Sequence, residues 1–335
     1  MFSRILIVKT SALGDIVQAF FAVDRLKETF PEIAVDWVVE SACSSLLKIY
    51  PHVDRILSVD TKEWRRKPFC SKTRKEISAY VKRVRSHEYG AVFDLQGNTK
   101  SGVLTAFARS KQKVGWGGAS LAEWPNAIFT HRRIQSPPGL SAREENLFML
   151  EAIFGKLKEE MPTRLPPLKK GACYLVATGY RWENKKLGIE GWIGLLGRIA
   201  ERLEGRFLFT WGTETEKLEC LQISQQLPGC CEILEYCPIL QLPALLNQVD
   251  SFLGVDSFLL HFAAYRGVPT YSIFGASSSS KYAPAGALHH SLQGSCPFGK
   301  IFDKRCPLLR SCPTGDCMKK LDPERVYQQL FASAH

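Results

Sequence analysis

Short apolar, often β-branched runs alternate along this chain with longer amphipathic stretches. In the first half, the short runs predict strands at residues 4–9, 34–40, 55–59 and 91–95. The longer stretches predict helices at residues 15–30, 41–50, 72–87, 99–109 and 141–157. Strands that alternate with helices are typical of a parallel sheet with helices on both faces, so this half is predicted to be an α/β, doubly wound domain.

The alternation starts again after residues 161–170, which hold three prolines and predict a linker. Further strands are predicted at residues 172–177, 206–211, 232–234, 252–255 and 270–274. Further helices are predicted at residues 190–203, 214–227, 242–249 and 257–266, with a last helix starting near Asp322 and Pro323. We therefore predict two Rossmann-like domains, residues 1–160 and 161–335, with a ligand cleft at the carboxyl ends of their strands. The last helix belongs to the second domain or packs back on the first.

Length and composition are those of an ordinary globular protein. The chain has 335 residues, which favours two domains. No apolar stretch is long enough to cross a membrane, and the first residues run straight into a strand with no signal-peptide pattern. Of the eleven cysteines, Cys43, Cys70, Cys173 and Cys220 are scattered along the chain, and without a signal peptide the cysteines are expected to be reduced thiols in a cytoplasmic protein.

The net charge of +11 is concentrated in residues 61–86, which hold ten Lys or Arg and two Glu. Such a one-sided segment indicates an anionic partner, which could be nucleic acid, a phospholipid surface or a phosphorylated substrate. A solvated helix face would explain it equally simply. Nucleic acid is disfavoured because few aromatic residues accompany the charges and no known nucleic-acid-binding module is present.

The first predicted strand leads into the sequence KTSALGDI at residues 9–16. Gly14 permits a tight turn, and Asp15 then lies at a helix N-terminus, where it either caps the helix or faces a ligand. The chain contains no G-x-G-x-x-G and no P-loop sequence, so neither a dinucleotide fingerprint nor a P-loop is predicted.

Several motifs resemble those of one enzyme family. The sequence ILIVKTSALGD at residues 5–15 resembles the opening of bacterial heptosyltransferases of glycosyltransferase family 9. DWVVE at residues 36–40 and FDLQGNTKS at 93–101 fit the same family, and all three are more similar to heptosyltransferase I than to heptosyltransferase II. In the second half, WG at 211–212 with Glu216, and VDS at 255–257 with His261, match the family's donor-side motifs in order and spacing.

This resemblance implies a GT-B architecture, in which two Rossmann-like domains face a central cleft. The first domain would bind the acceptor and the second the nucleotide-sugar donor. The implied reaction moves L-glycero-D-manno-heptose from ADP-heptose, with inversion, to the inner-core Kdo (3-deoxy-octulosonic acid) of lipid A during lipopolysaccharide biosynthesis. It implies a peripheral protein on the anionic, cytoplasmic face of the inner membrane, with no cofactor, no metal and no nucleic acid.

The resemblance also implies roles for individual residues. Asp15 would be the general base, because inversion in one displacement needs one carboxylate to take the acceptor's proton. Lys185 would stabilise the departing diphosphate, and Glu216 would bind the ribose hydroxyls. The implied donor-binding residues are Thr10, Ser11, Gly14, Lys185, Glu216, Asp256, Ser257 and His261. The implied acceptor-binding residues are Lys62, Arg65, Arg66, Lys67, Gln96 and Lys100, of which the first four belong to an acceptor-side loop. For His261 a packing role, and for Lys100 a solvated one, stay open.

Three positions depart from the family pattern. Phe258 stands where a glycine is usual, Lys185 is followed by a second lysine, so that Lys186 could take its role, and Ala122 stands where an arginine would precede Glu123. If the Phe258 ring filled the donor pocket, the alternative function would be a non-catalytic family member that binds nucleotide or a lipopolysaccharide precursor.

Four cysteines cluster near the end of the chain, at positions 296, 306, 312 and 317. They are separated by nine, five and four residues, so no C-x-x-C pair is present. The spacing therefore favours structural or incidental thiols and signals a zinc site only weakly.

Overall fold

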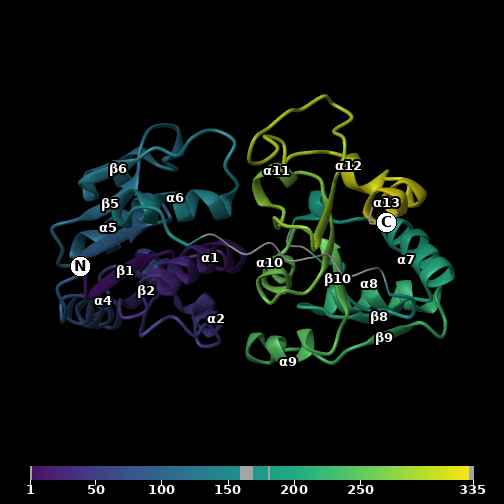
Figure 1. Ribbon diagram of the computed structural model, residues 1–335, viewed down its shortest axis with the longest axis horizontal. Helices are drawn as coiled ribbons and strands as arrows, with labels where there is room; N and C mark the ends of the chain where they lie inside the picture. The colour runs from purple at the N-terminus through teal and green to yellow at the C-terminus, as the bar shows by residue number, and fades with distance from the viewer. Residues whose placement is uncertain (1, 159–168, 180–181, 332–335) are drawn as a thin grey trace. The chain divides into compact units, whose positions relative to one another are not determined.

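The computed structural model describes residues 2–158, 169–179 and 182–331. The chain divides into two compact units, Met1–Glu160 and Met161–His335 (Figure 1). Most of the predicted linker, residues 161–168, lies outside the described residues. The acceptor and donor roles assigned to the two units stay predictions.

The first unit contains one sheet of six parallel strands. Its strand order is β3-β2-β1-β4-β5-β6. The strands are β1 (Arg4–Val8), β2 (Ala34–Glu40), β3 (Arg55–Val59), β4 (Ala91–Asp94), β5 (Lys113–Trp116) and β6 (Arg132–Ile134). Because β1 and β4 are neighbours, the loops that follow them meet at the same edge of the sheet.

Helices connect these strands. They are α1 (Leu13–Thr29), α2 (Ser44–Leu47), α3 (Thr61–Arg66), α4 (Ser71–Val84), α5 (Thr99–Phe107) and α6 (Ala142–Phe154), with 3-10 turns η1 (Ser41–Cys43), η2 (Gly118–Ser120) and η3 (Trp124–Phe129). α1 begins and ends within two residues of the prediction. The segment predicted as an acceptor-side loop forms α3 instead, because Asp60 caps it by accepting a hydrogen bond from Glu63 N at 3.1 Å.

The second unit repeats the topology of the first. Its sheet is also six-stranded and parallel, with the order β12-β11-β10-β7-β8-β9. The strands are β7 (Cys173–Ala177), β8 (Arg206–Phe209), β9 (Cys231–Ile233), β10 (Ser251–Val255), β11 (Thr270–Phe274) and β12 (His289–Gln293). Here β7 and β10 are the neighbours, so the loops after these strands share an edge.

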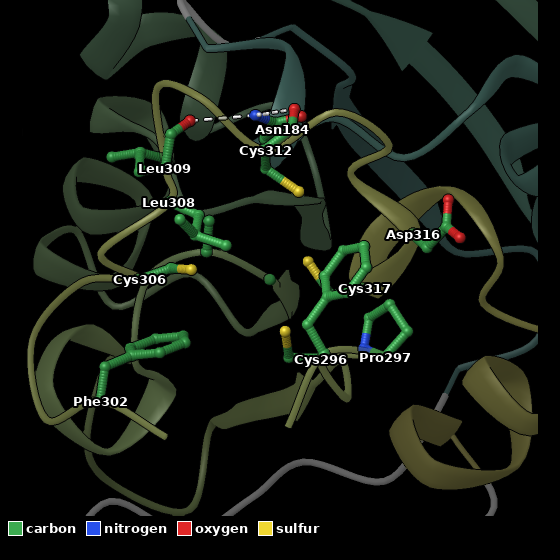
Figure 2. Close-up of a pocket in the computed structure, with 13 residues that line it drawn as sticks. Asn184, Cys296, Pro297, Phe302, Cys306, Leu308, Leu309, Cys312, Asp316 and Cys317 are labelled. Atoms are coloured by element: carbon green, nitrogen blue, oxygen red, sulfur yellow. Dashed lines mark hydrogen bonds between the residues drawn. The ribbon is translucent and has the colours of Figure 1, made fainter. Parts of the chain in front are cut away.

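The helices of the second unit are α7 (Ile189–Leu203), α8 (Glu214–Gln225), α9 (Leu242–Leu246), α10 (Phe258–Tyr265), α11 (Ser279–Tyr282), α12 (Asp316–Lys319) and α13 (Pro323–Phe331), with turns η4 (Glu183–Lys185) and η5 (Ile239–Gln241). Residues 294–315, between β12 and α12, form neither helix nor strand. The cysteines of this segment line a small cavity (Figure 2).

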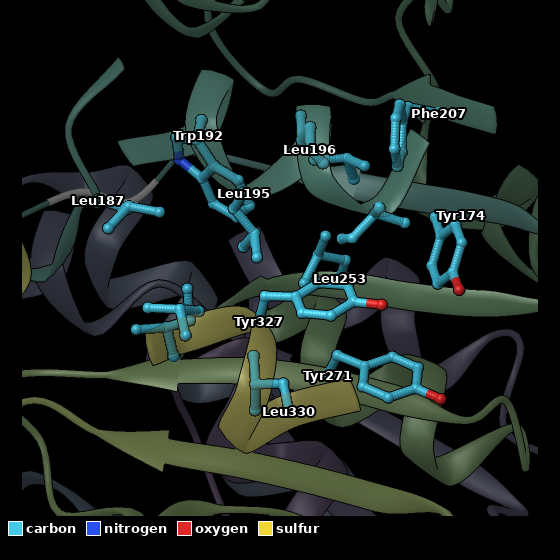
Figure 3. Close-up of a cluster of buried hydrophobic side chains, with 14 of the residues drawn as sticks. Tyr174, Leu187, Trp192, Leu195, Leu196, Phe207, Leu253, Tyr271, Tyr327 and Leu330 are labelled. Atoms are coloured by element: carbon cyan, nitrogen blue, oxygen red, sulfur yellow. The ribbon is translucent and has the colours of Figure 1, made fainter. Parts of the chain in front are cut away.

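The last helix packs into the core of the second unit. Tyr327 and Leu330 of α13 lie among the apolar side chains of α7 and the sheet, including Trp192 and Tyr174 (Figure 3). Burying a side chain of this size contributes about 1.5–3 kcal/mol. Glu324 adds ion pairs to α7, with Arg198 at 2.7 Å and Arg202 at 2.8 Å.

The predicted α/β architecture of two doubly wound sheets is confirmed. The structure adds β5, β6 and β12, which the sequence pattern did not predict. β6 is three residues long with two exposed arginines, and β12 begins with two histidines, so neither carries the apolar run that marks a strand. Among the described residues, no helix is both long and apolar enough to cross a membrane.

Candidate functional site

The loop after β1 is tied to the loop after β4 by the side chain of Gln96. The Gln96 Oε1 atom accepts hydrogen bonds from Thr10 N at 3.0 Å, Thr10 Oγ1 at 3.3 Å and Ser11 N at 3.2 Å. Gln96 was predicted to bind the acceptor, but its amide oxygen is used to shape the Thr10–Ser11 turn. Direct binding of the acceptor by Gln96 stays a prediction.

Asp15 lies in the first turn of α1, close to that loop. Its Oδ2 atom accepts a hydrogen bond from Ala12 N at 3.1 Å, which caps the start of the helix. The side chain is half-buried, and Gly14 before it lies in the same helical turn. The capping role weighed for Asp15 is thus present, and it leaves one carboxylate oxygen outside this contact.

Asp94 organises the end of β4, a role that sequence reasoning missed. Its fully buried carboxylate accepts hydrogen bonds from Gly97 N at 3.0 Å, Ser101 Oγ at 2.8 Å and Asn126 Nδ2 at 2.6 Å. Burial raises the pKa of Asp94 despite these hydrogen bonds. Asp94 stood in the quoted FDLQGN motif, directly at the end of the predicted strand, and this position was the available signal.

A cavity of about 720 Å³ opens beside α3 and α5. Three of the predicted acceptor-binding side chains line it, namely Lys62, Arg65 and Lys100. The remaining lining combines the carboxylates of Glu40 and Glu123 with neutral and mainly apolar side chains: Thr61, Trp64, Ile77, Asn98, Thr99, Val103, Leu104 and Phe107. The cavity therefore offers an apolar floor with charged groups around it.

The charged groups around this cavity are ordered by specific contacts. Lys100 Nζ lies 2.8 Å from Glu40 Oε1, so Lys100 is not merely solvated. Glu40 also accepts hydrogen bonds from the backbone and hydroxyl of Thr61. Glu123 accepts from Thr99 N at 2.9 Å and Thr99 Oγ1 at 2.6 Å, and these bonds lower its pKa.

Arg66 and Lys67 are placed differently from Lys62 and Arg65. They pair with Glu63 on their own helix, at 2.9 and 3.6 Å, and do not belong to the described lining of the cavity. The structure therefore separates the predicted basic cluster into two pairs, of which only Lys62 and Arg65 share a cavity with Lys100.

In the second unit, the predicted donor-side residues converge on Asp256, just after β10. Lys185 Nζ lies 2.6 Å from Asp256 Oδ2, and the Ser277 hydroxyl donates to the same oxygen at 2.5 Å. His261 Nε2 lies 3.4 Å from Asp256 Oδ1. All four residues are buried. Ser277 was missed from the sequence, where it appeared only as part of a serine run.

The electrostatics of this cluster favour an ionised Asp256. Burial alone would raise the pKa of the carboxyl group, but the hydrogen bond from His261 and the positive charge of Lys185 outweigh it. The net result is a pKa well below the ordinary value. The cluster is therefore a charged pair held inside the unit.

Lys185 and Lys186 have different partners. Lys186 Nζ lies 2.9 Å from both Glu183 Oε1 and Glu219 Oε1. Burial alone would lower the pKa of Lys186, but the hydrogen bonds to these two carboxylates outweigh it and leave the pKa raised. Of the two lysines, Lys185 is the one whose described contacts include Asp256. The geometry thus favours Lys185, rather than Lys186, as the lysine of the candidate donor site.

The N-terminus of α10 lies beside this cluster. Ser257 caps it, with Oγ accepting from Leu260 N at 3.4 Å. The Phe258 ring stacks on Phe262 one turn along the helix, with ring centroids 5.8 Å apart. The aromatic side chain is therefore engaged along its own helix.

Glu216 is held at the start of α8. Its Oε2 atom accepts a hydrogen bond from Gly212 N at 2.7 Å, in the predicted WG motif. A Cβ atom at Gly179 would come within 2.2 Å of the Glu216 carboxylate carbon, so that position excludes a side chain. Gly179 therefore allows the carboxylate to lie close to the loop that follows β7.

Comparisons with known proteins give one consistent result. The model of glycosyltransferase family 9 (heptosyltransferase) matches residues 77–310. Lipopolysaccharide heptosyltransferase 1 of Pseudomonas aeruginosa is 27% identical, over 98% of this chain and 97% of that protein. Its counterpart in Escherichia coli K12 is 25% identical, over 81% and 88%.

Solved structures share the fold. E. coli heptosyltransferase WaaC with ADP superimposes with a TM-score of 0.76 at 23% identity, covering 87% of this chain and 93% of that one. The family 9 glycosyltransferase of Veillonella parvula gives a TM-score of 0.75 at 15% identity, covering 98% and 96%.

Proposed function

Since the chain belongs to glycosyltransferase family 9, we propose that it transfers L-glycero-D-manno-heptose from ADP-heptose to the inner-core Kdo of lipid A, with inversion. The observation that carries the proposal is the buried Lys185–Asp256 pair beside the start of α10. Relatives that align over most of the chain are lipopolysaccharide heptosyltransferases, and one solved relative holds ADP.

The second unit would bind the donor. The first-turn N–H groups of α10 and the charge of Lys185 provide a positive environment suited to a diphosphate. Both would act most strongly on the charge that develops as ADP leaves, without requiring a metal ion. Glu216 would accept hydrogen bonds from the ribose hydroxyls, and Asp256 keeps the ammonium group of Lys185 in place. Thr10, Ser11 and Gly14 would also bind the donor.

The chemistry would be a single displacement. The acceptor hydroxyl oxygen bonds to the anomeric carbon as the bond from that carbon to the diphosphate breaks. Asp15 takes the hydroxyl proton, and ADP carries away the electron pair of the broken bond. One displacement at one carbon inverts its configuration, and general-base assistance of this kind contributes about 10²–10⁴ in rate.

The first unit would bind the acceptor in the cavity beside α3. Kdo carries a carboxylate and lipid A carries phosphates, which suit the charges of Lys62, Arg65 and Lys100. The remaining positive charge of residues 61–86, including Arg66 and Lys67, would hold the protein against an anionic membrane surface.

The test is a direct assay of the purified chain with ADP-heptose and Kdo-lipid A. We expect ADP release that depends on both substrates, and a glycoside whose anomeric configuration, read by NMR, is opposite to that of the donor. ADP binding without turnover would instead support a non-catalytic binding protein. Retention of configuration would overturn the single-displacement mechanism.

A further inference from the structure

The irregular segment at residues 294–315 is the longest stretch of the second unit's described residues without helix or strand. Irregular segments of this length are uncommon in compact domains, and those that are ordered usually serve a function. The segment carries three cysteines, and Cys317 of α12 follows as a fourth; all four are free thiols.

All four thiols line the same small cavity. Its volume is about 20 Å³, which is room for roughly one water molecule or one ion. Figure 2 shows the sulfur atoms of Cys296, Cys306, Cys312 and Cys317 directed toward the space between them. Phe302, Leu308 and Leu309 form apolar walls.

The local backbone is also arranged around the sulfur atoms. Gly315 N donates a hydrogen bond to Cys312 Sγ at 3.4 Å, and the chain then continues through the left-handed conformation of Gly315, with a φ of +67°. Hydrogen bonds from N–H groups to sulfur favour the thiolate, which is the form that binds metals. Positive charge is close along the chain, in Lys300, Lys304, Arg305 and Arg310.

We infer that Cys296, Cys306, Cys312 and Cys317 together bind one thiophilic divalent metal ion, such as Zn²⁺. Four thiols would each release a proton and bind the ion as thiolates, so the completed site has a net charge of −2. The neighbouring lysine and arginine side chains would offset that charge. Four protein ligands leave no open position, so the site would be structural and take no part in the transfer reaction.

Binding requires the four sulfur atoms to move inward. As they stand, no three His, Cys, Asp or Glu side chains of the described residues form a group that could hold a metal ion. Neutral thiols have nothing to draw them together, whereas a tetrahedral ion holds each thiolate at about 2.3 Å. Metal binding would require each cysteine to rotate about its Cα–Cβ bond (the χ1 angle), which sets the position of the sulfur atom. It would also require small shifts of the backbone of this irregular segment.

The segment contacts both sides of the candidate donor site. Asn184, next to Lys185, donates from Nδ2 to Leu309 O at 3.0 Å and Cys312 O at 3.3 Å. Cys306 N donates to Ala276 O at 2.8 Å, and Ala276 directly precedes Ser277. An ion that joins the four cysteines would therefore also fix the segments that carry Lys185 and Ser277.

The first experiment uses the full-length wild-type chain and Co²⁺ as the probe. Co²⁺ bound by four thiolates gives intense red-region d–d bands and a sulfur-to-metal charge-transfer band in the near ultraviolet, and Zn²⁺ should displace it. We expect those bands to saturate at one ion per chain. A spectrum of weak, six-coordinate cobalt only, at any ratio, would overturn the inference.

A second experiment locates the ligands without requiring any variant to fold. The chain is alkylated with iodoacetamide with and without Zn²⁺, and the cysteine peptides are quantified by mass spectrometry. We expect Zn²⁺ to protect positions 296, 306, 312 and 317 together and to leave the exposed Cys70 unchanged. Equal alkylation of the four with and without Zn²⁺ would contradict the site.

Cysteine variants then test whether these thiols are the metal ligands. Cys312→Ser with Cys317→Ser should abolish Zn²⁺ binding, while Cys230→Ser with Cys231→Ser, a pair outside the cavity, should keep it. Full metal content in the first double variant would overturn the assignment. Because these readouts measure metal and not turnover, they stay informative whatever reaction the chain performs.

Discussion

Lys185 Nζ and Asp256 Oδ2 are 2.6 Å apart, and both side chains are almost completely buried. The two residues come from the turn before α7 and from the end of β10, seventy-one positions apart in the chain. Removing one member of a buried charged pair leaves the other uncompensated, which typically costs about 3–5 kcal/mol. This pair therefore supports the fold as well as the candidate donor site.

The first prediction concerns that pair. Lys185→Met should lower the free energy of unfolding by about 3–5 kcal/mol, because Asp256 loses its counter-charge. It should also weaken ADP binding, measured by calorimetry on protein that is still folded. Lys186→Met is the matched control, since Lys186 pairs with Glu183 and Glu219 instead, and it should leave ADP affinity nearly unchanged. Equal effects of both variants on ADP binding would contradict the assignment.

The second prediction concerns pH. The pKa of Asp256 is lower in the folded chain than the usual unfolded value of about 3.9. The resulting stabilisation is present above that value and is lost as the pH falls through the folded pKa. Urea unfolding at several pH values below about 5 should show a steeper loss for the wild type than for Asp256→Asn. Parallel curves would mean that Asp256 is not held ionised.

The third prediction concerns Asp15. Asp15→Asn should lower kcat by about 10²–10⁴, because an amide cannot take the acceptor's proton. The amide oxygen can still accept from Ala12 N, so the melting temperature should change little. Asp15→Ala separates the two roles, since it should lose activity and also about 1 kcal/mol of capping energy. Turnover of the Asn variant within threefold of the wild type would exclude Asp15 as the base.

The fourth prediction separates two arginines of α3. Arg65 lines the 720 Å³ cavity, whereas Arg66 pairs with Glu63. Arg65→Ala should raise the acceptor KM and leave the donor KM unchanged, and added salt should weaken acceptor binding by the wild type. Arg66→Ala should alter the acceptor KM much less. A change confined to the donor KM in Arg65→Ala would place the cavity on the other substrate.

The fifth prediction concerns the anomalous aromatic residue of α10. The Phe258 ring stacks on Phe262, so Phe258→Gly should change ADP affinity by less than about threefold. It should reduce stability by about 1 kcal/mol or more, because an aromatic pair is worth about 0.5–1.5 kcal/mol beyond its buried area. Markedly tighter ADP binding by the glycine variant would show that the ring obstructs the site.

The main elements of the fold could be predicted from the sequence because their residues carry strong periodic signals. β1 and most of β2 are apolar, and α13 begins at Pro323, directly after Asp322, as expected. The sequence pattern failed where local signals are weak. Strand β6 carries exposed arginines, and α3 is a short charged helix that is specified mainly by its cap.

The candidate site could be predicted only in part. Lys185, Asp256 and His261 were predicted one by one, and the structure brings them together. Ser277 could not be assigned, since only tertiary packing brings its hydroxyl to Asp256. For the same reason, the sequence could not show that Gln96 bonds the Thr10 turn eighty-six positions away.

The positions of β1, β4, β7 and β10 in their sheets bear on how the molecule fluctuates. All four lie inside a six-stranded sheet with hydrogen-bonded neighbours on both sides, and their side chains are almost entirely buried. Amide hydrogens in such strands exchange with solvent only when a large part of the domain opens, while edge strands such as β6 and β9 exchange through small, frequent openings. The segments that carry Asp15, Gln96 and Asp256 follow these inner strands, so they are anchored to the backbone expected to exchange most slowly in each unit, and fraying at the sheet edges leaves them in place.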